Sequence, residues 1–417
     1  MGRVTELAEK LWTGALSADD HHPFNPLHVI EELALGVAFV SSFANVTALA
    51  TEEGLVLVDT GSFLFAPMVH GAVRSFTPRP LHTVIFTHGH LDHVFGVELY
   101  EPAARPQGGP ASPRVIAHEA LPAHFDRYRR SAGYNACINS RQFQLPVKWP
   151  TDYRYPDLTY THQMTLAVGG LTLELQHARG ETDDATWVWV PERRLLCTGD
   201  FFIWAAPNAG NPQKVQRYPC EWAAALRKMA ALGAEVLCPG HGVPIFGAAR
   251  VRQALDDTAA LLESLIEQTL ALMNAGARLE DAVHAVKAPA HLLERPYLRP
   301  IYDEPVFIVH NIWREFGGWW DGNPAHVKPA PAAALAVELA ALAGGAERLA
   351  ERAQVLARSG QLALACHLVE LAAGAAPDDA AIAAVRHDVY KRRTEAEQSV
   401  MARGIFRWAS EDKPGKR

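Results

Sequence analysis

The sequence predicts an α/β domain followed by an all-α domain, and three observations predict this division. Short apolar segments rich in β-branched residues recur from residue 37 to residue 240, as strands do. Beyond residue 332 the composition shifts to Ala, Leu, Glu and Arg arranged in helical pairs. A length of 417 residues exceeds what one hydrophobic core usually encloses, so two domains are expected.

The expected strands follow one another along the first domain. Residues 37–59 alternate strand and turn, with breaks at Asn45 and at residues 52–54. Residues 81–86 (LHTVIF) are apolar and β-branched enough for a buried strand. Later strands are expected at residues 171–176, at 186–190, at 195–200, where the strand runs into a Gly-Asp turn, and at 235–240.

Residues 87–93 (THGHLDH) are the most informative segment of the chain. They bring three imidazoles and one carboxylate together where a strand ends, which is a rigid platform. These ligands suit zinc, iron or manganese, and residues at i and i+2 of an irregular turn can converge on one ion. We therefore expect His88 and His90 to bind one metal, and Asp92 and His93 to face a second. The pattern favours a metallohydrolase.

Two ions need further ligands, which we sought among His, Asp and Glu residues at later strand ends. His177 and Glu181 both follow the strand expected at residues 171–176. Asp200 closes the strand that runs into the Gly-Asp turn, and His241 follows the last strand. These side chains are the candidates for the remaining ligands.

The order of these motifs resembles the metallo-β-lactamase superfamily. Its members carry HxHxDH, then a GHT-like turn, then a strand ending in Gly-Asp, then a late PGHG. The resemblance covers roughly residues 36–250 and implies an αββα sandwich. The ligands that it implies are His88 and His90 for the first metal, Asp92, His93 and His241 for the second, and Asp200 as the bridge between them.

One departure from the superfamily pattern points to a particular branch. Where most members have Gly-His-Thr, residues 180–182 are Gly-Glu-Thr, so a carboxylate replaces the third histidine. This replacement resembles the alkylsulfatases and assigns Glu181 to the first metal. His177 competes for that role but lies four residues early, which favours a supporting position. Residues 313–325, which contain GWWDGNPA, are similar to the signature that precedes the helical dimerisation domain of alkylsulfatases.

Motifs and composition together divide the chain. The predicted parts are an N-terminal extension (1–35), a metallo-β-lactamase-like catalytic domain (36–250), a helical connection with the GWWDGNPA segment (251–325) and a helical dimerisation domain (326–417). Residues 252–274 are a predicted helix, residues 346–375 two antiparallel helices, and a third opens after Pro377. Burying this apolar domain against a second copy predicts a homodimer.

Substrate residues are expected in two segments that are rich in hydrogen-bond donors. Residues 134–141 resemble a segment that lies near the sulfate in alkylsulfatases, and residues 208–218 form the second segment. Guanidinium and amide donors suit a tetrahedral oxyanion, although ordinary surface loops use the same residues. For Lys214 and Arg217 the alternative is an ion pair with Glu221 or contact with solvent. The candidate substrate residues are Tyr134, Asn135, Asn139, Arg141, Asn211, Lys214 and Arg217.

Charge and hydropathy narrow the class of protein. The chain has 39 basic and 46 acidic residues, a net charge of −7, which argues against a nucleic-acid-binding protein. Its start is polar, and no apolar run is long enough to span a bilayer, so we expect no membrane span and a cytoplasmic location. The five cysteines are scattered, which fits reduced thiols.

The leading functional hypothesis is a dinuclear zinc hydrolase. The resemblance implies two zinc ions per chain, a metal-bridging hydroxide as nucleophile and a small sulfate ester as substrate, with Asp92 and Asp200 as catalytic residues. Iron or manganese would fit the same ligands. The acid that protonates the leaving group stays open, with Tyr134 and His177 as candidates.

Three alternatives accompany this hypothesis. Asp200 stands where alkylsulfatases use Glu, residues 201–204 replace their His-Asn and Arg-Gly segment, and no sterol-carrier-like third domain follows the helical domain. These differences favour a lactone, β-lactam or thioester substrate, whose developing oxyanion a metal or an amide such as Asn211 would hold. A dimeric scaffold with a vestigial site and an iron-dependent redox role are the other two alternatives. The intact ligand spacing argues against the scaffold.

Overall fold

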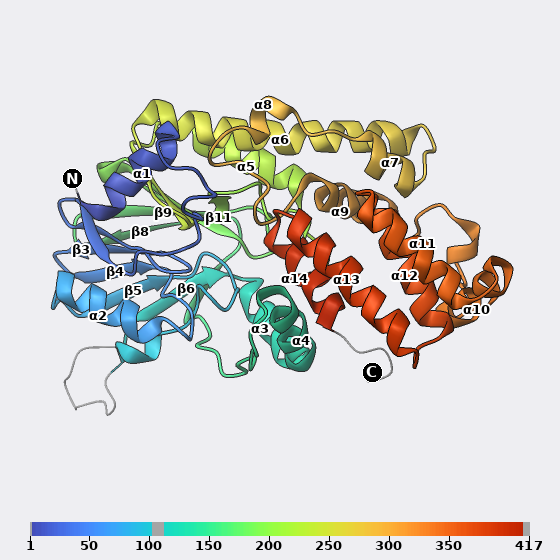
Figure 1. The fold of residues 1–417 in the computed structure, drawn as a ribbon. Coiled ribbons are helices and arrows are strands. Elements are labelled where there is room, and N and C mark those ends of the chain that lie inside the picture. Colours follow the sequence, from blue (N-terminus) through green and yellow to red (C-terminus); the bar gives the residue numbers. More distant parts are fainter. Residues whose placement is uncertain (1, 102–111, 412–417) are drawn as a thin grey trace. The chain divides into compact units, whose positions relative to one another are not determined.

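A computed structural model describes residues 2–101 and 112–411 of the chain (Figure 1). The chain forms two compact units, each assembled from separate stretches of sequence. The first unit comprises Met1–Ala132, Pro150–Gly276 and Asp281–Gly318. The second unit comprises Gly133–Trp149, Ala277–Glu280 and Trp319–Arg417. Residues 133–149, which we expected within the catalytic domain, thus pack with the C-terminal helices.

The first unit contains a seven-stranded sheet whose strands lie in chain order. They are β1 (Ile30–Ala34), β2 (Val37–Val40), β3 (Val46–Thr51), β4 (Gly54–Val58), β5 (Leu81–Ile85), β6 (Arg114–His118) and β7 (Leu158–Tyr160). Strands β1 to β4 pair antiparallel, and β4 to β7 pair parallel. Every residue of β2 and β4 is buried, because both strands are runs of Val, Leu and other apolar residues.

A second sheet of six strands has the order β13-β12-β11-β10-β9-β8. Its strands are β8 (Gln163–Val168), β9 (Leu171–His177), β10 (Thr186–Val190), β11 (Leu195–Ile203), β12 (Val236–His241) and β13 (Ile245–Phe246). Strands β8 to β11 pair antiparallel, and β11 pairs parallel with β12. Side chains along β9 alternate between buried leucines and half-buried polar residues, as a strand with one face on a core requires.

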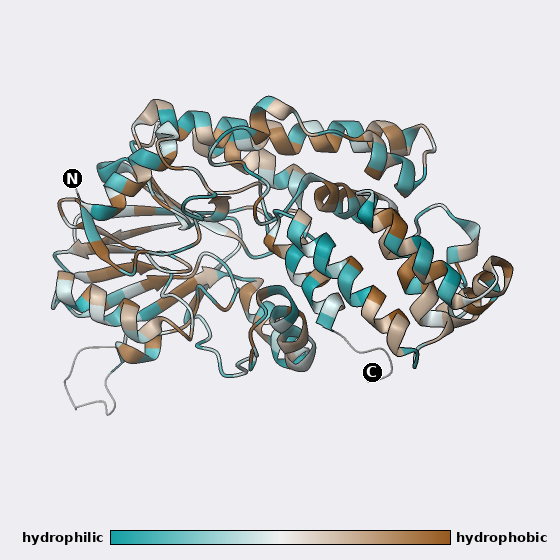
Figure 2. Ribbon diagram, viewed as in Figure 1, coloured by the Kyte–Doolittle hydropathy of each residue, from teal (hydrophilic) through white to brown (hydrophobic). Residues whose placement is uncertain are grey.

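Helices cover the outer faces of both sheets (Figure 1). Helix α2 (Ala66–Phe76) packs on β1 and β2, α5 (Pro219–Ala230) on β11, and α6 (Ala248–Asn274) on β12 and β13. Figure 2 shows hydrophobic and hydrophilic residues alternating along α6, as an amphipathic helix on a sheet requires. The predicted αββα sandwich is confirmed. The remaining helices of this unit are α1 (Arg3–Thr13), α3 (Leu121–Arg130), α7 (Leu279–Ala285, which straddles the unit boundary), α8 (Ala290–Leu293), α9 (Pro305–Gly317), η1 (Val97–Leu99) and η2 (Pro191–Arg193).

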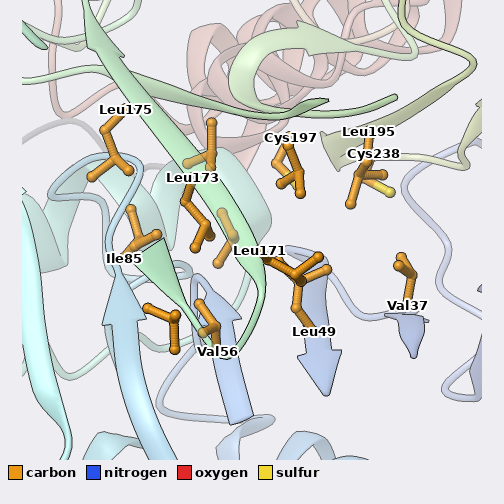
Figure 3. Close-up of a cluster of buried hydrophobic side chains, with 14 of the residues drawn as sticks. Val37, Leu49, Val56, Ile85, Leu171, Leu173, Leu175, Leu195, Cys197 and Cys238 are labelled. Carbon is orange, nitrogen blue, oxygen red and sulfur yellow. The ribbon is translucent and has the colours of Figure 1, made fainter. Parts of the chain in front are cut away.

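The hydrophobic core of the first unit lies between the two sheets (Figure 3). Val56 and Ile85 from the first sheet face Leu173 and Leu175 from the second, and all four are fully buried. Val4 of the predicted N-terminal extension belongs to the same core. Residues 1–35 therefore contribute a core side chain and the edge strand β1 to the sandwich.

Most expected strands appear within one residue of their predicted ends, but one differs. We expected residues 195–200 to be a strand ending in a Gly-Asp turn, whereas β11 continues through Asp200 to Ile203. The pairing of β11 with β12 shifts on both sides of Gly199, which adopts a positive φ of 49°. The Gly-Asp pair is therefore a bulge within a strand, which the sequence pattern does not distinguish from a turn.

The second unit is helical. Its elements are α4 (Ala132–Phe143), η3 (Pro324–His326), α10 (Ala332–Ala343), α11 (Ala346–Arg358), α12 (Leu362–Ala375), α13 (Ala380–Ala396) and α14 (Val400–Glu411). The expected helix pair at residues 346–375 is α11 and α12, and the connection bends at Gly360, whose φ is 80°. Asp379 caps α13 by accepting hydrogen bonds from the backbone N–H groups of Ala381 and Ile382 at 2.8 and 2.9 Å.

Helix α4 packs on α14 within the second unit. The Gln144 side chain donates to the Gly404 carbonyl at 2.9 Å, and the Arg141 guanidinium lies 4.0 Å from the ring centre of Trp408. A Cβ on Gly404 would collide with the backbone of Gln142, so the glycine permits this close approach. These contacts join residues 133–149 to the C-terminal helices.

Two smaller expectations concern the membrane and the thiols. Within residues 2–101 and 112–411, no helix is long and apolar enough to cross a membrane. All five cysteines are free thiols. Cys197 and Cys238 are buried register partners on β11 and β12, where they fill the core.

We predict that Leu173→Ala destabilises the first unit by about 2–5 kcal/mol, because it removes a fully buried side chain from between the sheets. Urea unfolding followed by tryptophan fluorescence measures the change. Leu35→Ala is the control: Leu35 is 83% exposed beside β1, so its loss should change the free energy of unfolding by less than about 0.5 kcal/mol. Equal effects of the two substitutions would contradict the assigned core.

Candidate metal centre

The candidate ligands lie where strands of both sheets end. Residues 87–93 follow β5, Glu181 follows β9, Asp200 lies in the bulge of β11 and His241 ends β12. The two sheets thus deliver their polar strand ends to one edge of the sandwich. Every predicted metal ligand belongs to the first unit.

The structure gathers these side chains into two adjoining groups. His88, His90, Glu181 and Asp200 form one group, and each offers a ligand atom within 4.8 Å of the others. His88 Nε2 lies 2.8 Å from His90 Nδ1 and 3.7 Å from Asp200 Oδ2. His90 Nδ1 lies 3.6 Å from Glu181 Oε1. These are the residues assigned to the first metal together with the assigned bridge.

Asp92, His93 and His241 form the second group, with ligand atoms again within 4.8 Å of one another. His241 Nε2 lies 3.4 Å from Asp92 Oδ2 and 3.4 Å from Asp200 Oδ2. His93 Nε2 lies 3.5 Å from Asp200 Oδ1. Asp200 therefore contacts members of both groups with its two oxygens.

These separations fit metal coordination. Ligand atoms about 2.1 Å from a tetrahedral ion stand roughly 3.4 Å from one another, and the distances that involve Asp200 run from 3.4 to 3.7 Å. Three buried atoms at the site, His93 Nε2, Glu181 Oε2 and Asp200 Oδ1, have no hydrogen-bond partner among the described residues. Buried polar atoms without partners are costly, and a cation would satisfy them.

Asp59 supports the second group from beneath. It is buried with a positive φ of 60°, and it accepts hydrogen bonds from the Thr87 backbone N–H at 2.7 Å and the Thr87 hydroxyl at 2.8 Å. His93 Nδ1 donates to the same carboxylate at 2.7 Å, which leaves Nε2 to face the site. Asp59 thus orients both the loop that carries the candidate ligands and the His93 ring. His241 is fixed in a similar way, with Nδ1 2.5 Å from the Phe43 carbonyl.

Two glycines allow Asp200 to reach the centre. A Cβ on Gly199 would lie 2.7 Å from Thr87 Cβ, and the positive φ of Gly199 disfavours any other residue. A Cβ on Gly240 would overlap the Asp200 carboxylate itself. The Gly-Asp motif at residues 199–200 and the Pro-Gly-His motif at residues 239–241 thus pack directly against each other.

The pKa shifts at the site show how the buried carboxylates and the imidazoles affect one another. Burial raises the pKa of Asp92, but His93 and His241 lower it to about 2. Burial lowers the pKa of His241, but the Asp200 and Asp92 carboxylates raise it to about 10. Burial lowers the pKa of His88 to about 4, and His93 adds to the effect. The pKa of His93 is also raised well above its usual value, because Asp200, Asp59 and Asp92 outweigh its burial, so the carboxylates favour the charged forms of His93 and His241.

Glu181, and not its competitor His177, lies in the first group of candidate ligands. Both its oxygens are buried, and Asn208 donates a hydrogen bond to Oε1. His177 instead donates from Nδ1 to the Ala185 carbonyl at 2.8 Å and stacks on His118 with ring centres 3.5 Å apart. The structure therefore brings Glu181 into the first group and leaves His177 outside it.

The predicted substrate residues divide into two sets. Tyr134, Asn135, Asn139 and Arg141 lie on α4 in the second unit, where Tyr134 is 63% exposed and Asn139 donates to the Asn135 carbonyl at 2.8 Å. Their role toward substrate stays a prediction. The other three, Asn211, Lys214 and Arg217, lie in the segment between β11 and α5 of the first unit.

The three residues in that segment have different environments. Asn211 is buried, and its Oδ1 accepts from the Gln213 backbone N–H at 3.1 Å, which closes a turn. Burial and then Arg217 lower the pKa of Lys214 to about 7, while the charges of Asp92 and Glu181 raise it. Lys214 therefore lies within electrostatic reach of both ligand groups.

Arg217 has a partner that we did not expect. It is only 1% exposed and pairs with Glu181, whereas we considered Glu221 or solvent as its alternatives to substrate; its role toward substrate stays a prediction. Glu221 is paired with Arg179 instead. The ion pair of Arg217 with Glu181 joins residues 36 apart in sequence, so no local pattern could indicate it.

Three further contributors were missed. Asn208 donates a hydrogen bond to Glu181, but its Pro-Asn dipeptide matches no motif that would indicate this contact. His124 on α3 lies 3.3 Å from Asp184, and a Cβ on Gly89 would come within 3.1 Å of both side chains, so this pair backs the His-Gly-His turn. Asp184 lies in a stretch, residues 177–184, that is rich in His, Glu and Asp, and this pattern could have indicated its place near the site. His124 stands alone in the sequence, so no local pattern indicates its place.

Phe24 is the third. It packs on His241 with ring centres 5.1 Å apart, and it comes from a segment that we expected to lie outside the catalytic domain.

Comparison with known proteins identifies the fold. The sequence profile of the metallo-beta-lactamase superfamily matches residues 41–241, and the profile described as alkyl sulfatase dimerisation matches residues 278–414. The chain carries an alkylsulfatase-like metallo-β-lactamase fold. A solved structure with this fold is that of the stereoselective inverting sec-alkylsulfatase Pisa1 from Pseudomonas sp., with a TM-score of 0.83 and 22% identity; the alignment covers 93% of this chain and 66% of that one.

Several curated proteins that are similar in sequence to this chain are alkylsulfatases. A linear primary-alkylsulfatase from Pseudomonas sp. (strain ATCC 19151) is 27% identical over 321 residues, which are 71% of this chain and 60% of that protein. An (R)-specific secondary-alkylsulfatase from Pseudomonas sp. is 26% identical over 335 residues, 73% of this chain and 50% of that protein. The chain thus spans between half and 60% of the length of these relatives.

We predict that Asp59→Asn weakens metal binding about 10- to 100-fold, because an amide cannot accept from Thr87 and His93 together and releases the His93 ring. Competition with a coloured chelator measures the affinity, and circular dichroism checks the fold. Asp378→Asn, at an exposed position before α13, is the control and should bind metal as the native chain does. Unchanged affinity in Asp59→Asn would contradict the orienting role.

Proposed function

We propose that this protein is a dinuclear metal-dependent hydrolase of sulfate esters. The observation that carries the proposal is the convergence of two ligand groups on the single carboxylate of Asp200 within an alkylsulfatase-like fold. Such a site suits two cations sharing one bridging ligand. The alkylsulfatase relatives support sulfate esters as the substrate class.

The seven side chains divide the work of holding the ions. His88, His90 and Glu181 would hold one ion, Asp92, His93 and His241 the other, and Asp200 both. Divalent ions at such a site supply Lewis-acid activation of water and of substrate oxygen atoms. Four imidazoles with three carboxylates are a donor set that zinc favours, and iron or manganese are the alternatives.

The remaining chemistry falls to the protein. Asp92 is 24% exposed, more than Glu181 or Asp200, so it is the carboxylate that solvent water reaches most readily and the candidate to orient that water by accepting a hydrogen bond. Phe24 and Phe43 flank the His241 ring at 5.1 Å each and shield it from solvent. Lys214, whose charge interacts with those of Asp92 and Glu181, is the candidate for contacting a sulfate oxygen.

A carbonyl substrate is the second candidate function. Two observations favour it: the bridging carboxylate is the short Asp200, and Arg217, expected to recognise an anion, is taken up by Glu181. A lactone, β-lactam or thioester would need fewer cationic contacts, since its charge develops only on one oxygen. Asn211 would serve as the amide donor only by leaving its turn.

We further propose that the second unit mediates a homodimer through α10. Leu335 and Leu342 are two helical turns apart, so they share one face, and they are 55% and 84% exposed. The buried side of the same helix carries the small Ala336 and Ala340. Exposed leucines on one face, in a region that matches an alkyl sulfatase dimerisation profile, suit a second copy of the chain as partner.

We predict that zinc-loaded protein releases sulfate from a medium-chain alkyl sulfate, and that Asp200→Ala lowers the rate at least ~100-fold because it removes the shared ligand. Sulfate is measured by ion chromatography and bound metal by mass spectrometry. Asp378→Ala is the matched surface control. A chromogenic β-lactam and a lactone are assayed in parallel. Turnover of these alone would replace the sulfatase proposal with the carbonyl one, and inactivity on all three would contradict both.

We predict that the double substitution Leu335→Asp and Leu342→Asp converts a dimer to a monomer, because it places two charges on the exposed face of α10. Light scattering after size-exclusion chromatography gives the mass. Leu35→Asp, at an 83% exposed site in the first unit, should leave the dimer intact. A monomeric native protein, or a dimer that survives the double substitution, would refute this interface.

A further inference from the structure

We propose that Arg217 is a positioning residue that orients Glu181 and balances its charge, so that the two side chains act as one nearly neutral ligand. The inference rests on the proposed metal site and concerns the first ligand group. It assigns a role to an arginine that is only 1% exposed and pairs with Glu181.

Arg217 and its neighbour hold Glu181 by both side chain and backbone. Arg217 Nη2 lies 3.2 Å from Glu181 Oε1, and Nη1 donates to the Glu181 carbonyl. The next residue, Tyr218, donates its backbone N–H to the Gly180 carbonyl at 3.0 Å. The turn that presents Glu181 is therefore fixed by two consecutive residues of another segment.

The side-chain donors select which Glu181 oxygen is left available. Asn208 and Arg217 both engage Oε1. Oε2 is buried without a hydrogen-bond partner among the described residues. Oε1 also lies 3.6 Å from His90 Nδ1, so the two donors hold the Glu181 carboxylate beside the first ligand group while Oε2 keeps its full capacity to accept a cation.

Arg217 is itself held rigidly. Asn311 on α9 accepts from the Arg217 backbone N–H at 3.2 Å and donates to its carbonyl at 2.9 Å. The Asn311 side chain is buried and is in turn bound by Arg314 at 2.9 Å. Because α9 fixes the backbone of Arg217, the guanidinium approaches Glu181 from one direction.

Charge explains why the arginine is needed. The first group contains two carboxylates, Glu181 and Asp200, beside two imidazoles. A buried carboxylate without a counter-ion is costly, and so is a buried guanidinium. Together Arg217 and Glu181 carry no net charge, like a neutral imidazole, which is the ordinary alternative ligand. Removing either partner should therefore be harmful, whereas exchanging both for neutral groups should be tolerated.

A double-mutant cycle on metal affinity tests the inference without any assay of activity. Zinc binding to metal-free protein is measured by competition with a chelator for the native chain, Glu181→His, Arg217→Met and the double variant. We expect each single substitution to weaken the tighter zinc site about 10- to 100-fold. The double variant should lie within about threefold of the native affinity, since a neutral imidazole needs no counter-ion.

Arg179→Met is the matched control, because Arg179 also pairs with a glutamate but both partners are over 40% exposed. It should change zinc affinity less than about twofold. Arg217→Lys keeps the positive charge but cannot contact both the side chain and the carbonyl of Glu181. It should fold, and its zinc affinity should lie between that of the native chain and that of Arg217→Met. This variant keeps the inference testable if Arg217→Met does not fold, which thermal unfolding of the metal-free proteins reveals.

Two results would overturn the inference. The first is additivity, in which Arg217→Met weakens zinc binding by the same factor in the native chain and in the chain that already carries Glu181→His. The second is an Arg217→Lys variant that binds zinc as tightly as the native chain. Either would leave the metal site in place and remove only the role of Arg217. Failure of the native chain to bind two zinc ions would instead refute the proposed function on which the inference rests.

Discussion

The contact of one carboxylate, Asp200, with both ligand groups is the constraint on which the rest of the site depends. Its two oxygens lie within 3.7 Å of His88, His93 and His241. A strand in regular register could not present it there, so β11 carries a bulge at Gly199. The same position requires a glycine at 240, where any Cβ would overlap the carboxylate. The backbone at Gly199 and Gly240, at the edge of the second sheet, is thus shaped to fit the Asp200 side chain.

Positive charge is the second requirement. Four carboxylates, those of Asp59, Asp92, Glu181 and Asp200, meet at this edge of the sandwich, and burial alone would disfavour their charged forms. Asp59 accepts hydrogen bonds from Thr87 and His93. Glu181 pairs with Arg217, but burial raises the pKa of Glu181 well above its usual range, although Arg217 lowers it. Asp92 and Asp200 are left to His93 and His241, whose pKa values they raise. A cation that binds there displaces these protons, so its affinity should increase with pH.

How far sequence could predict this depends on the range of each interaction. The strand ends and the motif at residues 87–93 are local, and Glu181 and Asp200 were chosen because each lies near an expected strand end and at a motif position of the resembled superfamily. The bulge at Gly199 was not predicted, since a Gly-Asp pair within a strand has the same composition as a turn. The pairing of Arg217 with Glu181 was not predicted, because the two residues lie 36 apart in sequence. Residues 133–149 were placed with the sandwich because nothing local reveals that they pack on α14.

The pairing of Arg217 with Glu181 leaves fewer hydrogen-bond donors and positive charges in the segment between β11 and α5 for binding a substrate. Of its candidate donors, Asn211 closes a turn and Arg217 is taken up, so recognition of an anion there would fall to Lys214. Burial and Arg217 lower the pKa of that lysine to about 7, so its charge is not assured at neutral pH. Nearby carboxylates favour the charged form, and cations bound by those carboxylates would remove that support. Within this segment, metal loading would therefore weaken the contribution of Lys214 to binding the full charge of a sulfate ester, whereas a neutral carbonyl substrate does not depend on that charge.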